Sequence, residues 1–180
     1  MKKFIISIDA GTTSNRSILF DLKGKPIFSS QKEFTQYFPK SGWVEHNPDE
    51  IWKTTIKTLK DVIQKAKRLK GKILSIGITN QRETTVLWDK KTGKPVYRAI
   101  VWQDRRTEEF CKKLRKQNKD TMVFNKTGLL IDSYFSGTKI KWILDNVPKA
   151  RQLMNKKQLL FGTVDSFLIW RLTKGKVHAT

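Results

Sequence analysis

Three apolar strands joined by short turns occupy the first 34 residues, and this feature constrains the fold most tightly. The pattern predicts strands at Lys3–Asp9, Arg16–Asp21 and Pro26–Phe34, with Leu22–Lys25 turning the chain between the last two. Neighbouring parallel strands would need a crossover of about a dozen residues or more, and the connections here are much shorter. The sequence therefore predicts an antiparallel meander at the N-terminus.

A long amphipathic helix is predicted after the meander. Asn47 can cap this helix, Pro48 suits its first position, and apolar residues recur at helical spacing until Gly71 stops it. Two more strands are predicted, at Lys72–Thr79 and Thr84–Asp89.

Further helices are predicted in the second half of the chain. They cover Asp104–Lys116, with Asp104 as the cap, and then Gly137–Asn146 and Thr163–Leu172. The order βββαβ, followed by more strands and helices, indicates an α/β domain with a mixed sheet. It departs from the strict βα alternation of a dinucleotide-binding unit.

The chain is strongly basic, since 37 Lys and Arg residues against 16 Asp and Glu give a net charge of +21. A charge of this size raises the hypothesis of nucleic-acid binding. The basic residues are spread over both halves, however, and no Arg/Gly-rich tract, zinc-finger spacing or RNA-recognition motif accompanies them. We therefore expect no nucleic-acid partner and interpret the charge as a Lys-rich surface that attracts anionic ligands.

Hydropathy and cysteine content indicate the compartment. No apolar run approaches the ~18 residues that a membrane span needs, and Cys111 is the single cysteine. One cysteine excludes an intrachain disulfide and fits a reducing compartment, so a cytoplasmic protein is predicted. We interpret Cys111 as a packing residue, and we expect His46 and His178 to be surface or capping residues.

The first polar motif lies between the first two predicted strands. Thr12, Thr13 and Ser14 offer hydroxyls and amides as donors to phosphate oxygens, and Arg16 adds a charge-assisted donor. Asp9, at the end of its strand, is suited to hold Mg²⁺ directly or through water. The alternative is a Thr/Ser-rich hairpin turn that satisfies its own backbone.

The second polar motif separates the strands predicted at Lys72–Thr79 and Thr84–Asp89. Arg82 and Glu83 supply a donor fork beside an acceptor, the pair needed to clamp the vicinal hydroxyls of a polyol. The alternative is a surface ion pair that contributes ~0–1 kcal/mol.

Two aromatic residues fall in the later motifs. Trp102 follows an apolar run, and its face can pack against the C–H groups of a carbohydrate or polyol. The alternative is a core tryptophan beside a helix cap. Tyr134 lies in Thr127–Gly137, which combines two glycines with a helix start, as in a substrate loop.

Together these segments resemble the N-terminal part of the FGGY carbohydrate kinases, and within that family the members that phosphorylate glycerol. The first loop alone is typical of the wider actin-like ATPases, whereas Asn80–Thr85 and Tyr134–Lys139 point to the glycerol-phosphorylating members. The segments that carry the resemblance are Asp9–Ser14, Gly42–His46, Ile76–Thr85, Ile100–Gln103, Tyr134–Asn146 and Leu160–Ser166.

The resemblance implies a ribonuclease-H-like domain of the actin/hexokinase ATPase type, two such domains around a cleft, and ATP-dependent phosphorylation of glycerol to sn-glycerol 3-phosphate. Glycerol and ATP with Mg²⁺ are the implied ligands, and a homo-oligomer is expected. Two alternatives stay open: a kinase for another polyol or sugar of the same family, and a non-catalytic basic fragment that binds nucleic acid or a partner.

The resemblance also implies roles for single residues. The nucleotide phosphates are expected to contact Thr12, Thr13, Ser14 and Arg16, and Asp9 is expected to organise Mg²⁺. Glycerol is expected to contact Thr12, Arg82, Glu83, Trp102 and Tyr134, with the tryptophan as a wall along the carbon chain.

The extent of the resemblance predicts an incomplete domain. Residues 1–180 are expected to be most of an N-terminal FGGY kinase domain, without a C-terminal domain and without the general-base Asp, which is expected beyond Thr180. We expect such a fragment or split-gene product to be a very poor catalyst alone, because phosphoryl transfer depends on positioning by the whole site.

Overall fold

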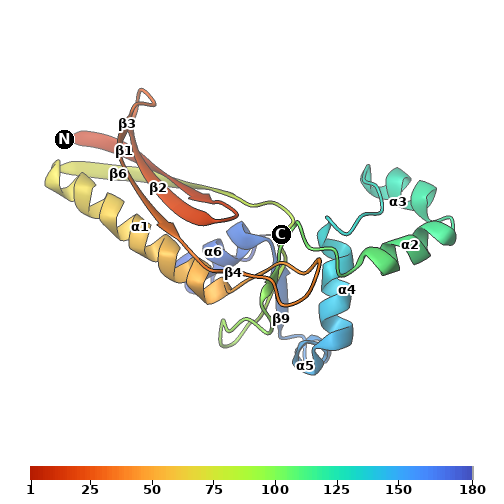
Figure 1. The fold of residues 1–180 in the computed structure, drawn as a ribbon. Helices are drawn as coiled ribbons and strands as arrows, with labels where there is room; N and C mark the ends of the chain where they lie inside the picture. The colour runs from red at the N-terminus through yellow and green to blue at the C-terminus, as the bar shows by residue number, and fades with distance from the viewer. Residues whose placement is uncertain (180) are drawn as a thin grey trace.

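A mixed four-stranded sheet forms one half of the computed structural model, which describes residues 1–179 (Figure 1). The strand order is β3-β2-β1-β6. The meander prediction is confirmed, because β1 (Lys2–Ala10), β2 (Ser14–Asp21) and β3 (Pro26–Glu33) pair antiparallel. The outermost strand β6 (Gly71–Asn80) runs parallel to β1, so the carboxyl ends of both strands lie at the same edge of the sheet.

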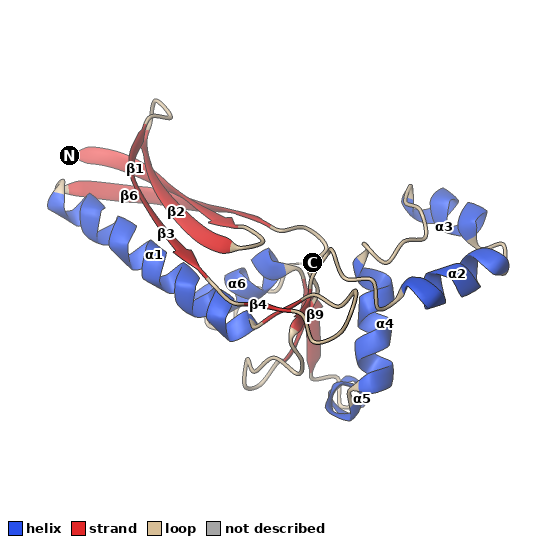
Figure 2. Ribbon diagram, viewed as in Figure 1, coloured by secondary structure: helices blue, strands red, loops and turns tan. Residues whose placement is uncertain are grey.

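Helix α1 (Pro48–Arg68) supplies the crossover that this parallel pair requires and covers one face of the sheet (Figure 2). The predicted cap is confirmed: the Asn47 side chain accepts a hydrogen bond from the backbone N–H of Asp49 at 2.9 Å. The apolar stripe of the helix packs on inward-facing side chains of the sheet. This cluster contains Phe4, Ile6, Ile8, Leu19, Leu59, Val62 and Ala66.

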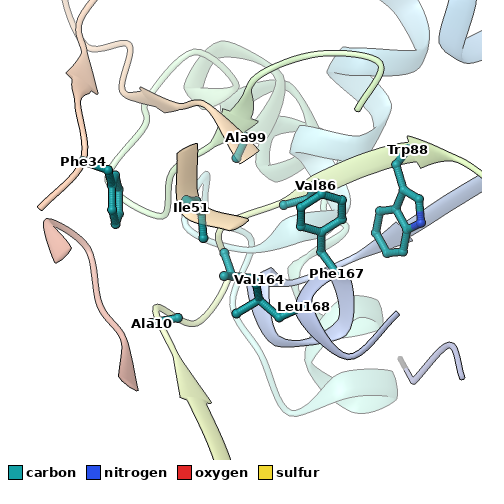
Figure 3. Close-up of a cluster of buried hydrophobic side chains, with 9 residues drawn as sticks. All are labelled: Ala10, Phe34, Ile51, Val86, Trp88, Ala99, Val164, Phe167 and Leu168. Carbon is teal, nitrogen blue, oxygen red and sulfur yellow. The ribbon is translucent and has the colours of Figure 1, made fainter. Parts of the chain in front are cut away.

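A second core lies where the end of the sheet meets three later elements. These are the short antiparallel pair β7 (Val86–Asp89) and β9 (Leu159–Gly162), and helix α6 (Val164–Leu172). Ala10, the last residue of β1, belongs to this core, so the turn that follows β1 starts from a fixed point. The buried members are Ala10, Phe34, Ile51, Val86, Trp88, Ala99, Val164, Phe167 and Leu168 (Figure 3).

The remaining elements form a small sheet, which lies beside the start of α1, and four helices beyond it (Figure 1). The small sheet has the order β4-β5-β8, with all pairs antiparallel. Its strands are β4 (Gln36–Tyr37), β5 (Glu45–His46) and β8 (Ala99–Ile100), and the helices are α2 (Glu108–Lys116), α3 (Asp120–Thr127), α4 (Ser136–Asn146) and α5 (Pro148–Asn155). The predictions at Gly137–Asn146 and Thr163–Leu172 correspond to α4 and α6.

The helix predicted from Asp104 begins later than expected, at Glu108. Asp104 is not its cap, because its carboxylate forms a bidentate ion pair with Arg106. Arg106 donates from Nε at 2.9 Å and from a terminal nitrogen at 2.8 Å. Helices α3 and α5 were not predicted. No helix among residues 1–179 combines the length and the apolar character that crossing a bilayer demands.

Candidate functional site

The turn between β1 and β2 is narrow and carries the first polar motif. The amide of Gly11 donates to the carbonyl of Ser14 at 3.0 Å, which closes the turn. Asp9 and Arg16 lie directly opposite each other on the paired strands. Because β1 turns its alternate residues toward α1, Asp9 faces the other side of the sheet. Gln31 of β3 holds this arrangement, donating to the Ser14 hydroxyl at 2.9 Å and accepting from Arg16 Nε at 3.1 Å.

The second polar motif leaves the sheet beside the first, because β1 and β6 are parallel and end together. The Gln81 amide N–H donates to the Ala10 carbonyl at 2.8 Å. Its buried side chain donates from Nε2 to the Gly11 carbonyl at 3.0 Å and accepts from the Thr84 hydroxyl at 2.9 Å. Gln81 therefore fastens the two motifs together. Sequence reasoning assigned it no role; the signal was its polar side chain directly after an apolar strand.

Trp102 reaches both motifs from the segment after β8. Its backbone N–H contacts the Thr84 hydroxyl at 3.3 Å, and its indole Nε1 donates to the Thr12 hydroxyl at 3.1 Å. The side chain is half-buried, and its ring makes a T-shaped contact with the ring of Tyr134 at a centroid distance of 6.1 Å. Trp102 thus lines a polar site rather than the interior of the core.

A cavity of about 360 Å³ opens at this junction. Three of the residues expected to contact a polyol line it together, although they come from three segments far apart in the sequence. The lining residues are Asn80, Gln81, Arg82, Trp102 and Tyr134. The exposed Arg82 supplies a positive fork, and the two aromatic rings supply apolar surface, a combination that suits a small polar ligand.

Glu83 lies next to this cavity but outside the set of lining residues. Its backbone is left-handed, with φ of 63°. Its carboxylate Oε2 accepts from the backbone N–H of Ser136 at 2.9 Å and from the Ser136 hydroxyl at 2.8 Å. Ser136 is the first residue of α4, where the positive end of the helix dipole favours a carboxylate. The start of α4 therefore fixes the Glu83 side chain.

His46 is fully buried, so the expectation of a surface or capping histidine is wrong for this residue. Gln81 Nε2 can only donate, so the 3.3 Å contact makes His46 Nδ1 the acceptor and leaves its proton on Nε2. Nε2 in turn donates to Gln36 Oε1 at 2.6 Å. Burial lowers the pKa of His46 to about 4, against an opposing effect of the Glu50 carboxylate. His46 is a neutral support for Gln81. Cys111 is buried, as predicted.

Arg106 braces the segment that carries Trp102. Its guanidinium lies 3.8 Å from the ring centroid of Trp43 and 4.6 Å from that of Trp142. Besides Asp104, it contacts Glu45 at 2.8 Å. A buried guanidinium with two carboxylates and two aromatic faces has its charge and its donors satisfied, which fixes the loop rigidly.

Metal-ligating residues do not cluster in the described part of the chain, where no group of three or more His, Cys, Asp or Glu residues is suited to hold an ion. Asp9 is a single half-buried carboxylate at the edge where both polar motifs emerge.

Comparisons with known proteins agree with this architecture. Residues 4–180 match the N-terminal domain of the FGGY family of carbohydrate kinases. The glycerol kinase of Malacoplasma penetrans is 59% identical over 99% of this chain, and that of Alkaliphilus metalliredigens is 58% identical over all of it. The chain spans about a third of these relatives' length, namely 35% and 36%.

Solved structures extend the similarity to the fold. A Plasmodium falciparum glycerol kinase with ADP superposes with a TM-score of 0.92 at 36% identity, covering 97% of this chain and 35% of that one. A gluconate kinase from Lactobacillus acidophilus shares the fold, with a TM-score of 0.82 at 23% identity, covering 95% of this chain and 33% of that one. The family match, which covers nearly every residue, and the paired loops at one sheet edge lead to one conclusion: this chain belongs to the FGGY family of carbohydrate kinases and matches its N-terminal domain.

Proposed function

We propose that the intact protein, meaning the longest polypeptide in which this chain occurs, transfers the γ-phosphoryl group of ATP to glycerol and forms sn-glycerol 3-phosphate. The observation that carries this proposal is the cavity lined by Arg82, Trp102 and Tyr134, joined to the β1–β2 turn through Thr12. The glycerol kinases 58–59% identical to this chain support the choice of glycerol among polyols.

Glycerol requires both donors and acceptors around a short carbon chain. Arg82 donates to hydroxyl oxygens, Tyr134 can donate or accept, and the Glu83 carboxylate accepts hydrogen bonds from hydroxyl groups. Trp102 packs its ring against the C–H groups. Because Glu83 uses Oε2 to bind Ser136, its other oxygen is the one we assign to glycerol.

ATP is proposed to bind with its phosphates at the β1–β2 turn. The hydroxyls and amides of Thr12, Thr13 and Ser14 then donate to phosphate oxygens, and Arg16 adds a charge-assisted donor. The Trp102–Thr12 hydrogen bond fixes the turn relative to the cavity, which aligns the two substrates. Catalysis of phosphoryl transfer depends mainly on such alignment.

Asp9 is the residue proposed to hold Mg²⁺. Magnesium in nucleotide sites keeps several waters and takes one or two carboxylates, so a single half-buried aspartate at the sheet edge fits it. When bound, the ion offsets the negative charge of the phosphates. We assign the general base to a carboxylate beyond residue 180, and we propose a cytoplasmic homo-oligomer on the family resemblance.

A coupled assay of ADP formation tests the substrate. The intact protein is offered glycerol, xylulose and gluconate at equal concentrations, with ATP and Mg²⁺ in excess. We expect kcat/KM to be highest for glycerol. A preference for xylulose or gluconate rejects the proposal. Tight binding of a DNA duplex at physiological salt by a protein without kinase activity also rejects it.

A further inference from the structure

Lys139 is a buried lysine on α4 whose exposed fraction is 0%. Its ammonium Nζ donates to the backbone carbonyl of Glu83 at 2.9 Å and to that of Tyr134. An ammonium group enclosed in this way is costly to desolvate, so its hydrogen-bond partners matter to the structure. Both partners are residues that we assign to glycerol.

The hydrogen bond from Lys139 to Glu83 holds a residue with an unusual backbone conformation. A left-handed φ of 63° is uncommon for a residue with a side chain, and surrounding contacts must hold it. Lys139 binds the carbonyl of Glu83, while Ser136, three residues earlier on the same helix, binds its carboxylate. Helix α4 thus holds both the backbone and the side chain of Glu83.

The charge on Lys139 is balanced by groups from several elements. Burial lowers the pKa of Lys139 to about 8, and nearby carboxylates act against this effect. The ammonium is therefore charged at neutral pH and loses its charge as the pH rises through about 8. The charged groups that face it are Glu83, Asp104 and Asp132, which favour the ammonium form, and Arg105, which opposes it.

We propose that Lys139 is the positioning residue of the glycerol site: by holding the carbonyls of Glu83 and Tyr134, it sets the directions in which these two residues face the substrate. This inference rests on the proposed function. It assigns Lys139 to glycerol affinity, because both of these hydrogen bonds run to residues that we assign to glycerol.

The test compares Lys139→Met with Lys141→Met in the intact protein. Methionine matches the lysine side chain as far as Cε and lacks its ammonium group, and Lys141 is an exposed residue of the same helix, bound to Asp145. We expect Lys139→Met to raise the KM for glycerol about tenfold or more, the loss expected when one charge-assisted hydrogen bond between glycerol and a displaced Glu83 is weakened, with kcat and the KM for ATP within about twofold. Lys141→Met should match the wild type.

Amide hydrogen exchange tests whether Lys139 holds Glu83 in place, without any assay of glycerol. In Lys139→Met the Ser136 amide should lose protection, because Glu83 no longer holds its position, while the Ile143 amide inside α4 should stay protected. Absence of glycerol turnover by the wild type rejects the proposed function, whereas an unchanged Ser136 amide rejects the role of Lys139. Equal losses of protection along all of α4 also reject it, because they show general unfolding.

The wild type supplies a measurement that does not depend on whether the variant folds. Its KM for glycerol should rise as the pH passes from 7.5 to 9.5, because the neutral amine of Lys139 keeps two N–H donors but lacks the charge that strengthens their hydrogen bonds, while the KM for ATP stays level. A KM for glycerol that does not change over this range overturns the proposal. In a folded Lys139→Met variant the pH dependence should be absent.

Discussion

The indole Nε1 of Trp102 donates to the hydroxyl of Thr12 at 3.1 Å, across 90 residues of sequence. This hydrogen bond joins a wall of the cavity to the turn proposed for the ATP phosphates. The relative placement of the two proposed substrate sites thus depends on one polar contact as well as on the sheet beneath it.

Trp102→Phe tests that contact, because it keeps an aromatic wall and removes the donor. We expect kcat/KM to fall about fivefold, the effect of losing roughly 1 kcal/mol from one neutral hydrogen bond. Steady-state kinetics of the intact protein measure it. Trp52→Phe, on α1 away from the cavity, is the control and should keep wild-type kinetics. Equal kinetics for both variants would show that the Thr12 contact has no role.

Substitutions of two exposed arginines should affect the KM values of different substrates. Arg82 lines the cavity, whereas Arg16 lies on β2 opposite Asp9. Arg82→Ala should raise the KM for glycerol by about 10- to 100-fold, as loss of a charge-assisted donor does, with little change in the KM for ATP. Arg16→Ala should show the reverse pattern. If both variants change the same KM, the assignment of the two sites is wrong.

Stability should depend on pH through His46. Its pKa is about 4 in the folded chain and near 6.5 when unfolded, so the unfolded chain binds the proton first as the pH falls. The contribution to the free energy of unfolding is complete above pH 6.5 and is lost between there and pH 4, by about 3 kcal/mol. Urea unfolding at pH 7.0 and 4.5 measures the change, and His46→Asn should lose less stability over this range. An identical loss in the variant would contradict the burial of a neutral imidazole.

Two glycines of the edge strand β6 form a matched pair for packing. A Cβ at Gly71 would overlap the ring of Phe4, whereas one at Gly77 meets nothing within 4 Å. Gly71→Ala should lower the free energy of unfolding by about 1–3 kcal/mol, as overpacking of a core does, and Gly77→Ala should leave it nearly unchanged. Urea unfolding of both variants provides the comparison. Equal stabilities would mean that Phe4 moves aside freely.

Elements with local signals could be predicted from the sequence. The meander follows from short turns between apolar strands, and α1 follows from the Asn47 cap and the apolar stripe, so both were predicted close to their observed bounds. Helix α3 gave no such signal, since it buries no residue. Helix α5 did carry one, because Pro148 occupies its first turn.

Features set by distant segments could not be read from local patterns. The sequence around Asp104 is typical of a helix cap. In the structure, however, its carboxylate pairs with Arg106, whose guanidinium lies against two tryptophan rings. His46 looks exposed until Gln36 and Gln81 enclose it. In the candidate site, the residue types of the cavity were predicted, but the roles of Gln81 and Lys139 arise only when separate segments meet.

The two hydrogen bonds from Gln81 to Ala10 and Gly11 close a loop of about seventy residues that includes the whole of α1. Closing a loop of this length has a larger entropic cost than pairing β1 with β2, so β6 is expected to dock after the hairpins have formed. The candidate site is therefore expected to assemble late in folding. A newly made chain with a finished meander but an undocked β6 would have no such site, and the proposed ligands would stabilise only molecules that have completed this last closure.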